Sequence, residues 1–318
     1  MIVCAGEAVI DMVQTSVPGL GEVFLPLPGG CSYNTSIAIS RLGTPAAFLG
    51  RLSNNFFGEI FVKRLRENNV RDDLIIRCEQ NSILAIVSLE KGKDPQYAFY
   101  DEGTSDRFLL PEDIKPLPEE TSCIVFGSIS MTMEPAASTI EKLIMKEAEK
   151  KKSVIAFDPN IRPIMIKDRD AYIKRFEKWI GASTIAKISS EDFEYIFPNT
   201  EPEEALRKII NLGSRLAIAT LGPNGAAAIL RRADGSVTKV SAPAVHVREV
   251  ADTVGAGDTF HGAFLSWLDK QGKMSHNGIA GLSENDLHDA LAFANKAAAI
   301  VCTRRGAEPP TLEEVGLF

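Results

Sequence analysis

The sequence lacks several features that would place it in a special class of protein. No run approaches the roughly 18 apolar residues of a membrane-spanning helix, and the apolar stretch at residues 2–6 is too short for a signal peptide. The five cysteines are odd in number and include no CxxC pair, so they fit neither a disulfide framework nor a zinc site. The four histidines show no metal-ligand spacing. We therefore expect a protein of the reducing cytoplasm with no membrane partner.

Basic residues are too few for a protein whose main partner is a nucleic acid. The formal net charge is −7, whereas binding to a phosphate backbone selects basic patches. Hydrophobic residues make up 45% and charged residues 24% of the chain, which is ordinary for a globular protein. We expect no nucleic-acid partner, and a length of 318 residues that fits one large α/β domain or two smaller ones.

Residues 252–260, DTVGAGDTF, are rich in glycine but form neither of two familiar nucleotide-binding loops. They lack the Gly-Lys-Ser or Gly-Lys-Thr ending of a Walker A loop. They also form an incomplete dinucleotide fingerprint, because Phe260 stands where the third glycine would be, and they come late in the chain. A Walker A loop is thereby excluded, and a plain oxidoreductase is disfavoured.

Short apolar runs alternate with helical patterns along most of the chain. Each run is almost continuously apolar, which is typical of strands buried on both faces. Residues 135–152 instead repeat apolar side chains at helical spacing and end in lysines, which suit the helix dipole. The alternation predicts an α/β fold with a parallel sheet covered by helices. The predicted strands are residues 2–6, 123–127, 154–158, 184–189 and 216–220.

Two segments do not follow that alternation. Residues 82–100 contain two β-rich runs joined by a polar turn at 91–95, which predicts a hairpin. Residues 22–27 are a further β-rich run just before Pro28. We interpret these segments as a small β-lid beside the main sheet. Another hairpin is predicted at 226–241, where Asp-Gly forms a strong turn pair.

Polar residues follow the ends of four predicted strands. Ligands of parallel α/β sheets bind beyond the carboxyl ends of the strands, so these residues predict one shared site at that edge. They are Ser128, Asp158, Asn160, Arg162, Ser189, Ser190, Thr220 and Gly222.

Two helix starts carry polar residues that allow two interpretations each. Asn34, near the start of a helix within residues 29–43, either caps that helix or binds a hydroxyl group in a cleft. Asp258, at the start of the amphipathic helix 258–268, is either a cap or a catalytic base. The N–H groups from Gly255 onward have no intrahelical partner, and glycine allows close approach, so Gly255–Gly257 predict an anion-binding nest.

Taken together, these pieces resemble the ribokinase/PfkB-type sugar kinases over essentially the whole chain. Residues 28–43 are similar to the N-terminal signature of that family, and residues 252–265 to its more specific C-terminal signature. Residues 220–226 are similar to its nucleotide-site turn, and residues 6–11 to its opening strand. The resemblance implies a three-layer, doubly wound, mostly parallel sheet of the ribokinase-like type. It also implies one large kinase domain over residues 1–318, with β-lid segments around 12–32 and 82–106.

Within the family, the fructokinases fit best, on the basis of residues 99–109, 158–163 and 186–192. The resemblance implies transfer of the γ-phosphoryl group of ATP to a primary hydroxyl of a hexose, converting D-fructose to fructose 6-phosphate. Two alternatives stay open. One is a 2-keto-3-deoxygluconate kinase, whose acidic substrate would need a cation such as Arg162 or Arg107. The other is a non-catalytic sugar or nucleotide sensor on the same fold, which could dispense with Asp258.

The family resemblance implies a role for each candidate residue. Asp258 would take the proton of the acceptor hydroxyl, and the amides of Gly255, Ala256 and Gly257 would hold charge developing on the γ-phosphoryl group. Arg162 is also open to the interpretation of a surface arginine that closes a loop. The implied sugar-binding residues are Asp11, Gly30, Asn34, Phe99 and Arg162. The implied nucleotide-binding residues are Lys187, Ser189, Thr220, Gly222, Gly225 and Asn295.

The resemblance further implies ATP and Mg²⁺ as cofactors, leaves open a monovalent cation such as K⁺, and implies a homodimer formed through the β-lid. Asp192 is the implied metal residue, although the family often carries glutamate in this place, after an asparagine where this chain has Ser189. Residues 53–58 lack acidic residues that the family often has there. Asp252 either stabilises its loop or helps to place a cation.

Overall fold

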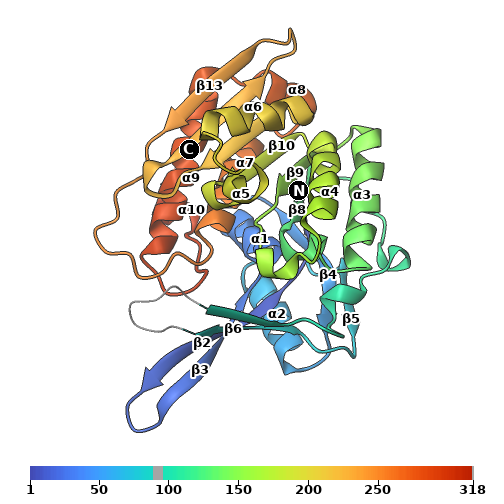
Figure 1. Cartoon of the computed structure of the whole chain (residues 1–318), viewed down its shortest axis with the longest axis vertical. Coiled ribbons are helices and arrows are strands. Elements are labelled where there is room, and N and C mark those ends of the chain that lie inside the picture. Colours follow the sequence, from blue (N-terminus) through green and yellow to red (C-terminus); the bar gives the residue numbers. More distant parts are fainter. Residues whose placement is uncertain (89–95, 317–318) are drawn as a thin grey trace.

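A computed structural model describes residues 1–88 and 96–316, and its main feature is a nine-stranded sheet covered by helices on both faces (Figure 1). The strand order is β13-β12-β11-β10-β9-β8-β1-β4-β5, and every neighbouring pair from β11 to β5 is parallel. β12 and β13 add an antiparallel hairpin at the β11 edge. The strands are β1 (Ile2–Ala5), β4 (Ala46–Ser53), β5 (Ile75–Cys78), β8 (Cys123–Gly127), β9 (Val154–Asp158), β10 (Ile185–Ser189), β11 (Leu216–Thr220), β12 (Ala226–Arg231) and β13 (Val237–Ala242).

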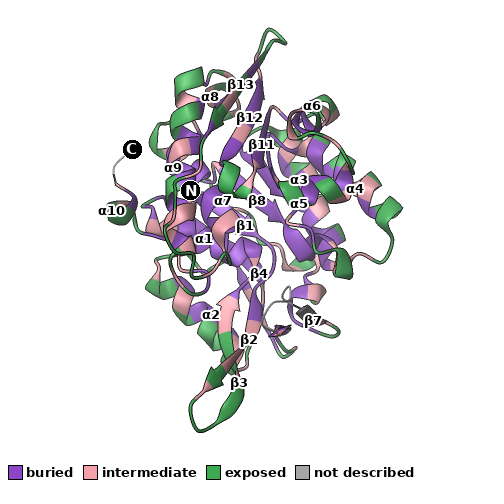
Figure 2. Cartoon of the chain, turned by 60° about the vertical axis from the view of Figure 1, so that its left-hand side comes forward, coloured by how far each residue is buried: buried purple, intermediate pink, exposed green. Residues whose placement is uncertain are grey.

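Alternate residues of each central strand enter two different cores, which explains the continuous apolar runs. In β1, Ile2 and Cys4 face one core while Val3 and Ala5 face the other, and all four side chains are fully buried. The first core is covered by α1 (Cys31–Arg41), α2 (Phe56–Glu67), α7 (Ala256–Lys270) and α9 (Glu284–Cys302). The second is covered by α3 (Ala136–Lys150), α4 (Arg169–Ala182), α5 (Ser190–Ile196) and α6 (Pro202–Leu212). The buried layer runs through the middle of the molecule (Figure 2). The predicted three-layer, mostly parallel architecture is confirmed.

Several elements were not predicted individually. β4 and β5 extend the parallel sheet beyond β1, although Arg51 interrupts the apolar run of β4 and β5 has only four residues. Residues 272–285 contain the short helix α8 (His276–Ala280), which was not predicted either. Ile279 of α8 is fully buried, so tertiary packing stabilises a helix too short for its periodicity to be visible. A short helix α10 (Leu312–Val315) follows α9.

A second sheet has the strand order β3-β2-β6-β7 and extends from the main body (Figure 1). It consists of β2 (Val9–Val17), β3 (Gly21–Gly29), β6 (Ile83–Ser88) and β7 (Gln96–Tyr100), so both predicted lid segments contribute to it. The β6–β7 hairpin and the β12–β13 hairpin are confirmed as antiparallel pairs. The turn predicted at 91–95 lies outside the described residues. The first lid segment was predicted to extend to residue 32, but α1 already begins at Cys31.

The carboxyl ends of the parallel strands lie together, as the polar residues that follow them predicted. Gly127 at the end of β8 pairs in register with Asp158 of β9, and Ser189 of β10 pairs with Thr220 of β11. Helices of the described part of the chain are all too short or too polar to cross a membrane.

Candidate active site

Asp258 lies in the first turn of α7 but does not cap it. The N-cap residue of α7 is Gly255, at φ 76°, and no side chain caps this helix. The Asp258 carboxylate, only 8% exposed, instead accepts a 2.8 Å hydrogen bond from Nδ2 of Asn34 on α1. The interpretation of Asp258 as a helix cap is therefore wrong. Its side chain faces a neighbouring helix rather than the amides of its own.

Asn34 is the fourth residue of α1, and it does not cap that helix either. The N-cap position belongs to Gly30, and no side-chain cap bond is present at this end. α1 and α7 approach closely because Gly262 faces Ala38, where an added Cβ would lie 2.9 Å from the alanine Cβ. This close packing brings Asn34 to Asp258 from 224 residues away in the chain.

The first amides of α7 are partly free, as an anion site requires. In the described part of the chain, the N–H groups of Gly257 and Asp258 donate to no acceptor. The Ala256 N–H, however, donates to the Thr253 carbonyl over 3.2 Å. The prediction that all amides from Gly255 onward are free is therefore wrong for Ala256. Free N–H groups and the helix dipole both favour an anion at this point.

A buried ion pair lies directly beneath these amides. Nζ of Lys187 on β10 is 3.0 Å from Oδ2 of Asp158 on β9, and both side chains are almost fully buried. An added Cβ on Gly257 would lie 3.2 Å from this Nζ, so the lysine reaches the start of α7. Burial by itself would lower the pKa of Lys187, but the carboxylates of Asp158 and Asp192 outweigh it and raise that pKa. Lys187 thus places a permanent positive charge beside the first amides of α7.

The environment of Asp258 gives it the pKa of a usable base. Burial raises the pKa of Asp258 to about 6, and the charge of Asp158 adds to this, while the hydrogen bond from Asn34 opposes it. A carboxylate with a pKa close to neutrality combines basicity with full ionisation above pH 7.

Asp11 and Arg162 lie near Asp258. Burial raises the pKa of Asp11 to about 7; the positive charge of Arg162 opposes this shift, and Asp258 and Asp252 reinforce it. Arg162 is exposed and donates to the carbonyl and side-chain oxygens of Asn160. Its guanidinium therefore closes its own loop and also acts electrostatically on Asp11, and its role toward a sugar or phosphate stays a prediction.

Phe99 and Gly30 complete the predicted sugar-binding set. Phe99 pairs with Ala85, which pairs with Asp11, so the three residues form one row across the second sheet and share a face. Gly30 has φ 109°, and an added Cβ would lie 2.8 Å from the carbonyl oxygen of Glu7. Its lack of a side chain therefore lets the start of α1 pack against residues 7–9.

Four of the six predicted nucleotide-binding residues lie near β11 to β13, while Lys187 and Ser189 belong to β10. Thr220 ends β11, and Gly222, at φ 54°, begins the exposed turn that follows. Asn295 of α9 donates to the carbonyls of Ala242 (3.1 Å) and Pro243 (3.0 Å). An added Cβ on Gly225 would lie 2.2 Å from the Ala242 carbonyl, so Gly225 and Asn295 both hold the segment that follows β13. That segment, with α9, lines an open hollow of about 790 Å³ formed by Val245, His246, Val247, Arg248, Glu249, Ala251, Lys296, Ala299, Ile300, Thr303 and Glu314.

Ser189 and Asp192 form a reciprocal cap at the start of α5. Ser189 Oγ accepts from the Asp192 N–H, and Asp192 Oδ2 accepts from the Ser189 N–H, each over 3.1 Å. The other oxygen, Oδ1, accepts a 2.7 Å bond from the Ile161 N–H. Each carboxylate oxygen of Asp192 thus already accepts one backbone bond and ties α5 to the loop after β9.

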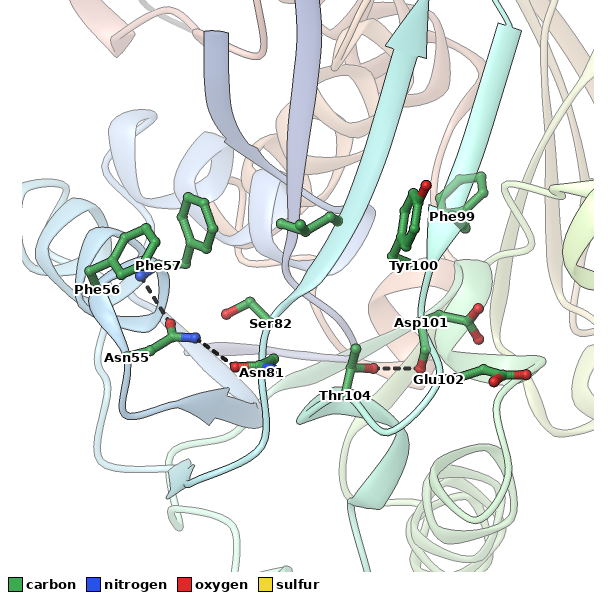
Figure 3. Close-up of a pocket in the computed structure, with 11 residues that line it drawn as sticks. Asn55, Phe56, Phe57, Asn81, Ser82, Phe99, Tyr100, Asp101, Glu102 and Thr104 are labelled. Carbon is green, nitrogen blue, oxygen red and sulfur yellow. Dashed lines mark hydrogen bonds between the residues drawn. The ribbon is translucent and has the colours of Figure 1, made fainter. Parts of the chain in front are cut away.

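A second hollow, of about 560 Å³, lies between the start of α2 and the second sheet (Figure 3). Leu84 and Tyr100 pair in register, one residue along from the row of Asp11, so they belong to the opposite face of the sheet. Phe99, which belongs to the row of Asp11, also lines this hollow. The lining residues of the hollow are Asn55, Phe56, Phe57, Asn81, Ser82, Leu84, Phe99, Tyr100, Asp101, Glu102 and Thr104.

Two residues of the site were not predicted to belong to it, and the role of a third was not recognised. Asp158 was recognised only as one of several polar residues after strands, yet it holds Lys187. Cys31, the first residue of α1, lies against Asp258 and Asp158. His261 is fully buried, with Nδ1 3.7 Å from Asp158 Oδ2. A cysteine at a helix start and a histidine on an apolar helix face look structural in sequence, so only tertiary packing reveals their position.

Asp252 stabilises its loop, one of the two roles considered for it. Its Oδ1 accepts from the Val254 N–H over 3.0 Å, and its Oδ2 accepts from the Gly306 N–H over 2.9 Å. Because an added Cβ on Gly255 would lie 2.6 Å from the Ala307 Cβ, the whole turn packs against residues 306–307. Asp252 therefore holds the turn from which α7 starts.

Comparisons with known proteins agree with this fold. Residues 1–314 match the pfkB family of carbohydrate kinases. A fructokinase from Rhizobium leguminosarum bv. trifolii is 36% identical over 290 residues, covering 91% of this chain and 86% of that protein. A solved fructokinase from Xylella fastidiosa with bound ATP has a TM-score of 0.86 and 25% identity, covering 99% of this chain and 96% of its own. A fructokinase from Vibrio cholerae O395 in its fructose, ADP and calcium ion bound form has a TM-score of 0.78 and 26% identity. The match covers 96% of this chain and 94% of that chain.

These matches extend over nearly the whole of this chain and of each relative. They confirm the ribokinase-like fold and the resemblance drawn from residues 28–43 and 252–265. The chain therefore belongs to the pfkB family of carbohydrate kinases, as a sugar kinase of the fructokinase type.

Proposed function

We propose that the protein transfers the γ-phosphoryl group of ATP to the primary hydroxyl of D-fructose, giving fructose 6-phosphate. The observation that carries the proposal is the position of Asp258: its buried carboxylate lies beside free helix amides and above a buried lysine. Fructokinases among the relatives and a neighbour bound to fructose and ADP support the choice of sugar.

The chemistry needs a proton acceptor and a place for negative charge. The sugar is held over Asp11, Asn34 and Phe99, with its reacting hydroxyl directed at Asp258. Asp258 takes the hydroxyl proton as the oxygen attacks phosphorus, a contribution typically worth about 10²–10⁴-fold. The amides of Gly257 and Asp258, with Lys187 behind them, stabilise charge developing on the phosphoryl oxygens. Closure of the second sheet as a lid excludes water from this step.

The nucleotide is held on the side of β11 to β13. Its phosphates lie along Thr220 and the turn at Gly222, and its base enters the hollow beside α9, whose wall Gly225 and Asn295 support. Bound Mg²⁺ neutralises phosphate charge and orients the transferred group. Each carboxylate oxygen of Asp192 already accepts one hydrogen bond from a backbone N–H. Asp192 would therefore bind the metal ion only through the remaining lone pairs of these oxygens. A requirement for a monovalent cation such as K⁺ remains a prediction.

We also propose a homodimer formed through the second sheet, in the cytoplasm. Leu20, Phe24 and Leu25, on β3 and the turn before it, expose 76%, 46% and 41% of their surface. Such a group of exposed apolar side chains on an edge strand favours pairing with a second copy. All five cysteines are free, which is typical of a reducing compartment.

The test of the proposal is an ADP-release assay across fructose, 2-keto-3-deoxygluconate, ribose and adenosine. We expect kcat/KM to be highest for fructose, by at least about tenfold, a difference in transition-state binding of roughly 1.4 kcal/mol. A preference for 2-keto-3-deoxygluconate would replace the sugar assignment and leave the kinase assignment standing. If the folded protein binds a sugar specifically but releases no ADP, the result would instead indicate a non-catalytic sugar sensor.

The rate should fall in acid because Asp258 works only when deprotonated. With pKa values of about 6 for Asp258 and about 7 for Asp11, kcat/KM should be level above pH 7.5 and decline below. At pH 5, one pH unit below the pKa of Asp258, the loss should be at least about tenfold. The profile is measured by ADP release, with enzyme returned to pH 8 to check recovery. A profile that stays level down to pH 5 would contradict the assigned base.

A further inference from the structure

Cys31, Asp158 and Asp258 come from three different elements and meet at one buried point. Their ligand atoms, the Cys31 Sγ and one carboxylate oxygen from each aspartate, all lie within 4.8 Å of one another. Cys31 begins α1, Asp158 ends β9 and Asp258 lies in the first turn of α7. Their exposed fractions are 6%, 1% and 8%. Among the described residues, this is the group of ligand side chains close enough to hold a metal ion.

Several buried polar atoms around this point have no hydrogen-bond partner among the described residues, so they are available to a bound ion. Asp158 Oδ1 is buried and accepts no hydrogen bond among the described residues, since Lys187 takes Oδ2. His261 is 0% exposed, neither of its ring nitrogens has a partner there, and its Nδ1 is 3.7 Å from Asp158 Oδ2. Buried polar atoms are satisfied in the great majority of cases, so these atoms call for a ligand.

The donor set selects the chemistry of that ligand. A thiolate, two carboxylates and a nearby imidazole suit Zn²⁺ and similar soft divalent cations, whereas Mg²⁺ prefers oxygen ligands and water. The charges also balance. Two carboxylates and a thiolate carry three negative charges, and Lys187 with a divalent cation carries three positive charges. In a tetrahedral zinc site with Zn–ligand distances of about 2.0–2.3 Å, the ligand atoms are roughly 3.3–3.8 Å apart, which is compatible with three ligand atoms that lie within 4.8 Å of one another.

We propose that Cys31, Asp158 and Asp258 form an inhibitory site for a soft divalent cation of the Zn²⁺ type. The cation displaces the thiol proton of Cys31 to solvent and bonds to the thiolate and to one oxygen of each carboxylate. His261 lies next to Asp158 but outside this group of three ligand atoms. While the cation is bound, Asp258 cannot accept a proton from a substrate hydroxyl. The binding site stands by itself; only the inhibitory consequence rests on the proposed function of Asp258.

Binding is tested on the whole protein without nucleotide, with Cd²⁺ as the probe. We expect one equivalent to produce a thiolate-to-metal charge-transfer band in the ultraviolet. Cys31→Ser should abolish the band and weaken binding at least about tenfold, since even indirect supporting residues of metal sites contribute 10–100-fold. Cys302→Ser, which changes the half-exposed cysteine at the end of α9, is the matched control and should keep the band. A band that survives in Cys31→Ser and is lost in Cys302→Ser would overturn the site.

Inhibition is tested separately, by ADP release at fixed Mg²⁺ and ATP with micromolar free Zn²⁺. We expect more than about tenfold inhibition that a chelator reverses, and resistance in Cys31→Ser or, should serine not fold, in Cys31→Ala. Circular dichroism verifies that each variant is folded. Cd²⁺ binding at Cys31 without inhibition would keep the metal site and count against Asp258 as the base. Absence of the band in the folded wild-type protein would overturn the metal site and leave the proposed function untouched.

Discussion

Replacing Asp258 with asparagine should lower kcat by about 10²–10⁴-fold, the usual contribution of a general base. Asparagine has nearly the same shape and can still accept the hydrogen bond from Asn34, but it cannot take a proton. ATP binding should therefore change little, because the Gly257 amide and Lys187 remain in place. The measurements are kcat by ADP release and nucleotide affinity by titration calorimetry. Activity within a few-fold of wild type would rule out the assigned base.

Stability provides an independent check that the lost activity is not lost folding. Because burial raises the pKa of Asp258 above its unfolded value, the stability associated with its protonated form is fully present at low pH and is lost as the pH rises through about 6. At pH 8 the wild type keeps a buried charge that asparagine removes, so Asp258→Asn should melt at the same or a higher temperature. Asp269→Asn, near the other end of α7, is the matched control and should leave kcat unchanged.

Replacing Lys187 with methionine should have the largest effect on stability. It leaves Asp158, which is about 1% exposed, as an unpaired buried charge, and breaking a buried ion pair in this way costs about 3–5 kcal/mol. The free energy of unfolding is measured by urea denaturation at pH 8. Activity should also fall, because the positive charge behind Gly257 is removed. Lys63→Met, in an exposed pair with Glu67, should change stability by no more than about 1 kcal/mol.

A double variant separates the two roles of Lys187. Adding Asp158→Asn to Lys187→Met removes the uncompensated charge, so much of the lost stability should return. Activity should not return, because the anion site still lacks its cation. Recovery of both stability and activity in the double variant would show that Lys187 is only a structural partner of Asp158.

The strands that the sequence alone predicted are those in which burial of both faces makes almost every residue apolar. β1, β8, β9, β10 and β11 are covered on both faces, so their apolar runs are nearly continuous and separate clearly from helical spacing. β4 and β5 escaped prediction because Arg51 divides one run and the other is four residues long. Their strand conformation depends on pairing with β1 and with each other, which local sequence does not encode.

The two helix starts illustrate the same limit at the level of single side chains. An asparagine or aspartate near the start of a helix can cap that helix, and capping involves only the first helical turn. The local sequence therefore does not distinguish a cap from a residue that binds a partner elsewhere in the fold. The structure decides it, since Gly262 allows α1 and α7 to pack closely enough for Asn34 to meet Asp258.

What the sequence by itself determined is the class of fold, the edge of the sheet where the site lies and the glycine-rich start of α7, because each depends on the order and spacing of neighbouring residues. Only the tertiary structure decided the partners: Asn34 for Asp258, Asp158 for Lys187, and Cys31 and His261 beside them. The hydrogen bond between Asn34 and Asp258 alone joins residues 224 positions apart. The energies of these contacts arise from burial and electrostatics that exist only once the sheet and its helices have packed.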